Sequence, residues 1–80
     1  MAVSDKDTNG SSGVAAVERA LSIVEAVEAS AEPQTLAQIS QRTGLYKSTI
    51  LRLLVTLERR GLIVRWSDGR YALGPAAFRL

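Results

Sequence analysis

The chain has 80 residues, with ten Lys and Arg, eight Asp and Glu, and neither cysteine nor histidine. This length allows one small domain, and the missing residue types exclude disulfides, thiolate metal sites and histidine-based catalysis. No run of 18 apolar residues and no leader of basic followed by apolar residues occurs, so the sequence predicts a cytoplasmic protein without a membrane span.

Charge is distributed unevenly along the chain. Residues 1–32 carry two basic and six acidic side chains, a net charge of −4, whereas residues 33–80 carry eight basic and two acidic ones, a net charge of +6. A cationic second half favours a polyanionic partner, although a charge pattern that only aids solubility would look the same.

The first part of the chain is expected to be a tail followed by a helix. Residues 1–13 are polar and rich in Ser, Gly, Asp and Asn, which predicts a disordered N-terminal tail. A helix is expected from about Val14 to Ala29. Its two apolar stripes are Val17, Leu21 and Val24, and Ala20, Ile23 and Val27. Together the stripes cover more surface than one small core requires, so one of them is expected to face a second subunit.

A capping box predicts the start of a second helix. Thr35 can accept a hydrogen bond from the backbone N–H of Gln38, whose side chain can reach back to the N–H of Thr35. This helix is expected over Leu36–Thr43, because Gly44 suits the positive φ that ends many helices.

A third helix is expected from near Tyr46 to about Arg60, with Gly61 as its left-handed cap. Its apolar side carries Ile50, Leu53, Leu54 and Leu57, and its opposite side carries Ser48, Arg52, Thr56 and Arg59. No acidic residue lies between Glu32 and Glu58. A helix that is apolar behind and basic in front, held at a turn by a partner helix, suits the major groove of DNA.

The remaining residues predict a β-hairpin. Leu62–Trp66 is rich in β-branched and aromatic residues, Asp68-Gly69 is a hairpin turn sequence, and Arg70–Leu73 is the return strand. The order helix, helix, turn, helix, hairpin predicts a mainly α winged helix-turn-helix with a small β-hairpin over residues 14–74. Residues 75–80 are expected to begin a further helix.

Eight side chains are candidates for contact with DNA. They are Arg42, Tyr46, Lys47, Ser48, Thr49, Arg52, Arg65 and Arg70. Base readout is assigned to Ser48, Thr49 and Arg52, and phosphate contact to Lys47, Arg42 and the two hairpin arginines. Lys47 lies in the first turn of its helix, where the dipole disfavours a cation, and a nearby phosphate would explain that position.

For several of these side chains a structural role stays open. Ser48 and Thr49 could cap the helix, and Arg42 could complement a helix C-terminus. Tyr46 could donate to a phosphate or cover the turn. Packing against the core is favoured for three aromatic residues, Trp66, Tyr71 and Phe78.

No catalytic, metal or cofactor site is expected. Lys47-Ser48 resembles the end of a phosphate-binding loop, but Tyr46 stands where that loop requires glycine. The chain is therefore not predicted to be an enzyme. The alternative to DNA binding is a winged helix that contacts another protein, which the basic outward face disfavours.

Three segments resemble IclR-type bacterial transcriptional regulators. Residues 43–54, followed by Thr56-Leu57-Glu58, are similar to the recognition helix of that family. Residues 17–24 resemble its first helix, and Gly61-Leu62-Ile63 with residues 70–74 resemble its wing. Tyr46 differs from the proline that the family usually has at the start of the recognition helix.

The resemblance implies more than the residues themselves do. Family members bind palindromic DNA operators as homodimers, through the first helix and a linker helix, and act in the bacterial nucleoid as repressors or activators. Residues 75–80 would begin that linker. A small-molecule effector would bind a C-terminal domain that this chain lacks.

Overall fold

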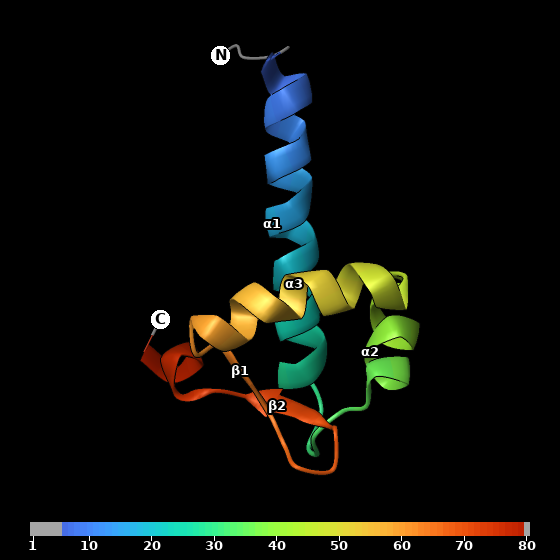
Figure 1. The fold of residues 1–80 in the computed structure, drawn as a ribbon, viewed down its shortest axis with the longest axis vertical. Coiled ribbons are helices and arrows are strands. Elements are labelled where there is room, and N and C mark those ends of the chain that lie inside the picture. The colour runs from blue at the N-terminus through green and yellow to red at the C-terminus, as the bar shows by residue number, and fades with distance from the viewer. Residues whose placement is uncertain (1–5, 80) are drawn as a thin grey trace.

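The computed structural model describes the backbone of residues 6–79 and the side chains of residues 13–79. Its elements are α1 (Lys6–Glu28), α2 (Leu36–Thr43), α3 (Lys47–Arg59), β1 (Ile63–Arg65), β2 (Tyr71–Leu73) and a 3-10 helix, η1 (Pro75–Arg79). Figure 1 shows α3 crossing in front of the long helix α1, with α2 beside the start of α3 and the hairpin below. Three helices and an antiparallel hairpin form the winged helix-turn-helix that the sequence predicts.

Helix α1 begins at Lys6, before the expected start at Val14. The prediction of a disordered tail over 1–13 is therefore corrected for residues 6–13, while residues 1–5 lie outside the described residues. The physical reason is helix cooperativity. Nucleation is the unfavourable step, so a helix already anchored by packing can extend by one hydrogen bond per added residue.

Helix α2 has the predicted boundaries. The N–H of Gln38 donates to Thr35 Oγ1 at 3.1 Å, and the N–H of Thr35 donates to Gln38 Oε1 at 2.8 Å. At the other end Gly44 has φ +76° and its N–H donates to the Ser40 carbonyl at 2.9 Å. The capping box and the glycine stop are both confirmed, and both lie within a few residues of the helix ends that they define.

The hairpin is closed by a three-residue loop. Trp66 N–H donates to the Arg70 carbonyl at 2.7 Å, and Gly69 N–H donates to the Trp66 carbonyl at 2.9 Å. Gly69 has φ +89°, as expected for the left-handed residue that follows a tight turn in such loops. On its other edge β2 pairs with Gln34, since Gln34 and Tyr71 exchange two backbone hydrogen bonds of 2.8 Å.

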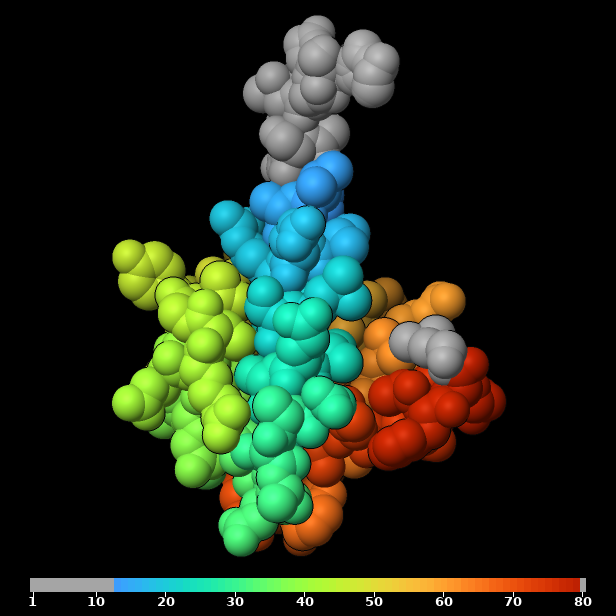
Figure 2. Space-filling view, turned by 180° about the vertical axis from the view of Figure 1, so that it is seen from behind, coloured from blue at the N-terminus to red at the C-terminus, as the bar shows by residue number. Residues whose placement is uncertain are grey.

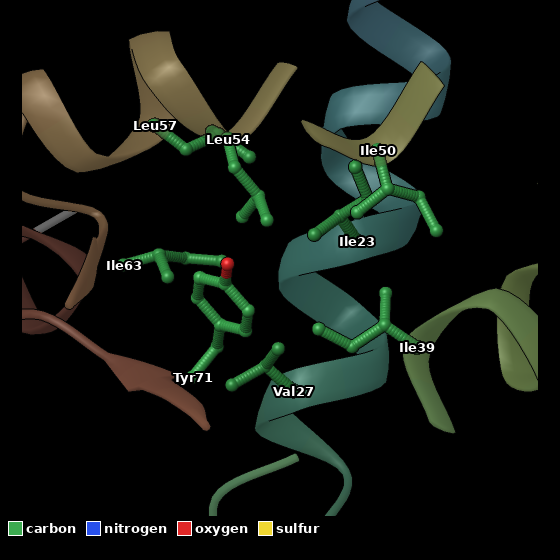
Figure 3. Packing of buried hydrophobic residues seen from close by; sticks show 8 residues of the cluster. All are labelled: Ile23, Val27, Ile39, Ile50, Leu54, Leu57, Ile63 and Tyr71. Carbon is green, nitrogen blue, oxygen red and sulfur yellow. The ribbon is translucent and has the colours of Figure 1, made fainter. Parts of the chain in front are cut away.

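One small core joins the three helices and both strands. Its buried members are Ile23 and Val27 of α1, Ile39 of α2, Ile50, Leu54 and Leu57 of α3, Ile63 of β1 and Tyr71 of β2 (Figure 3). The burial of Tyr71 agrees with the sequence prediction. The packing predicted for Phe78 is wrong, because Phe78 is 74% exposed, and Trp66 is 46% exposed. Neither aromatic residue belongs to the buried core, which is filled without them.

Gly74 lies against the backbone of Gly61. Its N–H donates to the Leu62 carbonyl at 2.8 Å. A Cβ at this position would overlap the carbonyl oxygen of Gly61 and lie 2.9 Å from its carbonyl carbon. The approach therefore requires glycine, because the obstacle is backbone and cannot move aside as a side chain would.

Gly74→Ala is expected to destabilise the domain by about 2–3 kcal/mol, the usual range for overpacking a rigid site. For a domain of this size that corresponds to a fall in Tm of roughly 10–20 °C, measurable by calorimetry. Gly13→Ala is the matched control, because a Cβ at Gly13 meets no atom within 4 Å. An unchanged Tm for Gly74→Ala would contradict the close approach.

Candidate nucleic-acid interface

Side-chain hydrogen bonds fix the turn between α2 and α3. Ser40 Oγ donates to the Leu45 carbonyl at 2.6 Å. Thr43 Oγ1 donates to the Ile39 carbonyl at 2.8 Å and accepts from the Leu45 N–H at 3.2 Å. The direction in which α3 leaves the turn is therefore set by two hydroxyls of α2. Sequence reasoning missed both, although hydroxyl residues beside a helix-ending glycine are typical of such local bonds.

The start of α3 is open to solvent. Tyr46 is the N-cap residue, it makes no side-chain hydrogen bond to the helix, and its side chain is 82% exposed. Lys47 and Ser48 are exposed and Thr49 is half-buried. The first N–H groups of a helix have no intrahelical acceptor, so this end of α3 presents backbone donors together with these side chains.

The two faces of α3 are separated as the sequence predicts. Ile50, Leu54 and Leu57 are buried in the core. Ser48, Arg52, Thr56 and Arg59 are exposed. Neither Ser48 nor Arg52 is buried, so both side chains are open to a partner, as contact with DNA requires.

Two apolar side chains also belong to the exposed surface of α3. Leu51 is 46% exposed and Val55 is 64% exposed. Val55 lies three residues after Arg52, on the same side of the helix, and Leu51 borders that side. Neither residue was assigned to a face of this helix from the sequence. The helical spacing alone would have placed Val55 outward.

The exposed side of α3 lies away from α1. In Figure 1 α3 passes in front of α1, and from the opposite direction in Figure 2 it is α1 that faces the viewer. The outward face of α3 therefore belongs to a surface that α1 does not cover. The hairpin lies below α3 in Figure 1, so a partner placed along α3 could also meet the wing.

The two hairpin arginines differ in their surroundings. Arg65 is exposed on β1. Arg70 Nε donates to Asp68 Oδ2 at 2.9 Å, and its guanidinium carbon lies 5.8 Å from the centre of the Trp66 ring. The backbone N–H of Arg70, and then its side chain, hold the pKa of the Asp68 carboxyl below its ordinary value. Arg70 is thus already engaged, unlike Arg65.

Arg42 is exposed in the last turn of α2. With Ser22, Glu25, Ala26 and Thr43 it lines a hollow of about 380 Å³ between α2 and α1. This position favours neither of the two roles foreseen for Arg42, a helix-end cation or a phosphate ligand.

The described residues offer neither a metal site nor a membrane-spanning helix. No group of three or more acidic, histidine or cysteine side chains there could hold a metal ion. Within residues 6–79 no helix has the length and apolar content needed to cross a bilayer.

Comparisons with known proteins match this arrangement. Residues 16–66, more than half of the chain, match the IclR helix-turn-helix domain. The transcriptional regulator BhcR of Paracoccus denitrificans is 40% identical over 70 residues, which cover 86% of this chain and 25% of BhcR. The chain spans 25–31% of the length of the curated regulators it matches.

Solved structures agree. An IclR-family transcriptional regulator from Brucella abortus has a TM-score of 0.74 at 29% identity, over 81% of this chain and 25% of that one. An IclR homologue from Microbacterium hydrocarbonoxydans, complexed with 4-hydroxybenzoate, has a TM-score of 0.71 at 25% identity, over 80% of this chain and 27% of that one. The chain belongs to the IclR family of helix-turn-helix transcriptional regulators and carries its DNA-binding domain.

Proposed function

We propose that this domain recognises an operator by placing α3 in the major groove of double-stranded DNA. The observation that carries the proposal is the exposed face of α3, which presents Ser48 and Arg52 while its opposite side is buried. An α-helix fits the major groove, where base edges present distinct patterns of donors and acceptors. The alternative, a winged helix for protein contact, has no such observation in its favour.

Base readout is assigned to the first half of α3. Arg52 can donate two hydrogen bonds to guanine O6 and N7, and the hydroxyls of Ser48 and Thr49 can meet a base edge or a phosphate. Val55 and Leu51 extend this assignment, because exposed apolar groups beside Arg52 suit contact with a thymine methyl group.

Phosphate contact is assigned to the periphery. Lys47 and Tyr46 stand at the exposed start of α3, Arg42 at the end of α2 and Arg65 on the wing. These contacts position the domain on the duplex without reading its sequence. Arg70 was also a candidate for phosphate contact, but unlike the other basic candidates its guanidinium is paired with the Asp68 carboxylate.

The whole regulator is proposed to act as a homodimer. Helix α1 exposes a row of apolar side chains on the side away from the core, Val14, Val17 and Leu21, each more than half exposed. Beside this row Ala16, Val17 and Ala20 form, with Leu53, Thr56 and Leu57 of α3, a mostly apolar hollow of about 270 Å³. Such a surface fits a second copy of the same helix better than water.

The proposal also covers the rest of the regulator. The relatives extend well beyond the share that the chain spans, and an IclR homologue is complexed with 4-hydroxybenzoate, which together support a further domain that binds a small-molecule effector. Residues 75–80 would begin the connecting linker. As far as it is described, this segment is the 3-10 helix η1 rather than an α-helix.

Lys47→Ala and Arg52→Ala are expected to weaken DNA binding in different ways. Lys47→Ala should weaken binding to all duplexes and reduce the slope of log affinity against log salt by about 0.9, as the loss of one phosphate contact does. Arg52→Ala should cost about 1–3 kcal/mol on a selected site and relax the choice of base at one position. Fluorescence anisotropy over a salt series, after selection of sites from random DNA, measures both.

Arg79→Ala is the matched control, because Arg79 is exposed in η1, outside the proposed interface. Unchanged affinity, salt slope and base preference in both α3 variants would contradict the assigned roles.

Leu21→Glu is expected to convert the proposed dimer into a folded monomer, because a buried carboxylate pair at the subunit contact would be unfavourable while Leu21 is outside the core. Sedimentation velocity measures the mass, with Ala37→Glu, an exposed position of α2, as control. A dimer that persists in Leu21→Glu would place the subunit contact elsewhere.

A further inference from the structure

The wing tip holds its two oppositely charged side chains in a fixed arrangement. Asp68 Oδ1 accepts from the backbone N–H of Arg70 at 3.0 Å, and its other oxygen accepts from Arg70 Nε at 2.9 Å. One carboxylate thus binds both the backbone and the side chain of the same residue. Because that backbone also closes the hairpin through the Arg70 carbonyl and Trp66 N–H, the guanidinium is tied to the turn itself.

The indole of Trp66 completes the arrangement. The guanidinium carbon of Arg70 lies 5.8 Å from the ring centre, within the range of a cation–π contact. The side chain of Arg70 is 35% exposed, against 49% for that of Asp68. We call these three residues, Trp66, Asp68 and Arg70, the tip clamp. Among the side chains of residues 13–79, the Asp68–Arg70 pair is the single ion pair.

The tip clamp changes the charge that the wing can offer to a polyanion. Residues 62–74 carry Arg65, Asp68 and Arg70, a net charge of +1. A guanidinium already paired with a carboxylate neutralises that carboxylate rather than a phosphate. Arg65 makes no ion pair among the described side chains and is exposed, so it alone is available.

We propose that Arg70 is a positioning residue of the wing rather than a phosphate ligand, and that Asp68 holds its guanidinium off the duplex. The inference rests on the proposed DNA binding. It follows that removing the Asp68 charge frees Arg70 to bind a phosphate, so that a single neutral substitution adds a contact to the interface.

The test is the salt dependence of binding by the 80-residue chain and its variants to a pooled random-sequence duplex. Asp68→Asn should steepen the slope of log affinity against log salt by about 0.9. Its affinity should then fall three- to four-fold more than that of the parent chain for each four-fold rise in salt, on the order expected for one extra phosphate contact. The double variant, Asp68→Asn with Arg70→Gln, keeps the tip neutral and should have the slope of the parent chain, since neither side chain then contacts a phosphate.

Two controls match these changes in charge away from the tip. Glu18→Gln removes one negative charge from the exposed side of α1, and Arg79→Gln removes one positive charge from η1. Neither should change the slope. An Asp68→Asn slope equal to that of the parent, or a double-variant slope lower than that of the parent by about 0.9, would overturn the inference.

A second readout does not depend on DNA. Trp66 is the one tryptophan of the chain, so its emission reports the clamp in the free protein. Arg70→Gln and Asp68→Asn should both shift that emission, and the two controls should not. Identical emission in all variants would overturn the clamp. A parent chain that binds the duplex at no salt concentration would instead overturn the proposed function, whatever the emission of its variants.

Discussion

One small core must be shared by the three helices and the hairpin of this domain, and the rest of the structure follows from that constraint. The largest fully buried side chains come from four elements, Ile23 of α1, Ile39 of α2, Ile50 and Leu54 of α3, and Ile63 of β1. A chain of this size has room for only one apolar centre, so the apolar side of α3 has to face it. The outward position of Ser48, Arg52 and Val55 is then a consequence of helical geometry.

The wing is held against the rest of the domain by a small number of contacts. A hairpin of two three-residue strands is marginal by itself. Here Tyr71 places its ring in the core, and its backbone exchanges two hydrogen bonds with Gln34, which is buried. The hairpin is thus held on one edge by the segment before α2 and on one face by the helices. With Ile63 of β1 also buried in the core, these attachments give the tip a defined place relative to α3.

Local chemistry explains which features the sequence predicted. The start and end of α2 depend on Thr35, Gln38 and Gly44, each within a few residues of the boundary it defines, and all were predicted. The pairing of Gln34 with Tyr71 was missed, because the two residues lie far apart in the chain and neither has a side chain typical of that contact. The helical start at Lys6 was also missed, since composition describes a segment by itself and not the helix that it extends.

The candidate site divides in the same way: features set by helical spacing were predicted, and a contact set by the shape of a loop was not. Periodicity predicted the two faces of α3, and exposure of Ser48 and Arg52 confirms them. Counting charges treated Arg65 and Arg70 as equivalent, and only coordinates distinguish them, because the acid that engages Arg70 is two residues away on a turn. Whether a neighbour at that distance pairs depends on the shape of the loop, which the Asp-Gly sequence alone does not determine.

The Asp68–Arg70 pair is exposed, and pairs of this kind contribute little to stability. The pair therefore affects the net charge of the wing tip and the order of the Arg70 side chain more than the free energy of unfolding. A neutral pair adds little to the field that a duplex meets beyond a Debye length of roughly 8 Å, so in the proposed mode of binding the approach would be guided by the cations of α2 and α3 and by Arg65. A wing built this way would add little affinity that is independent of sequence, and the proposed discrimination between operators would be left to the face of α3.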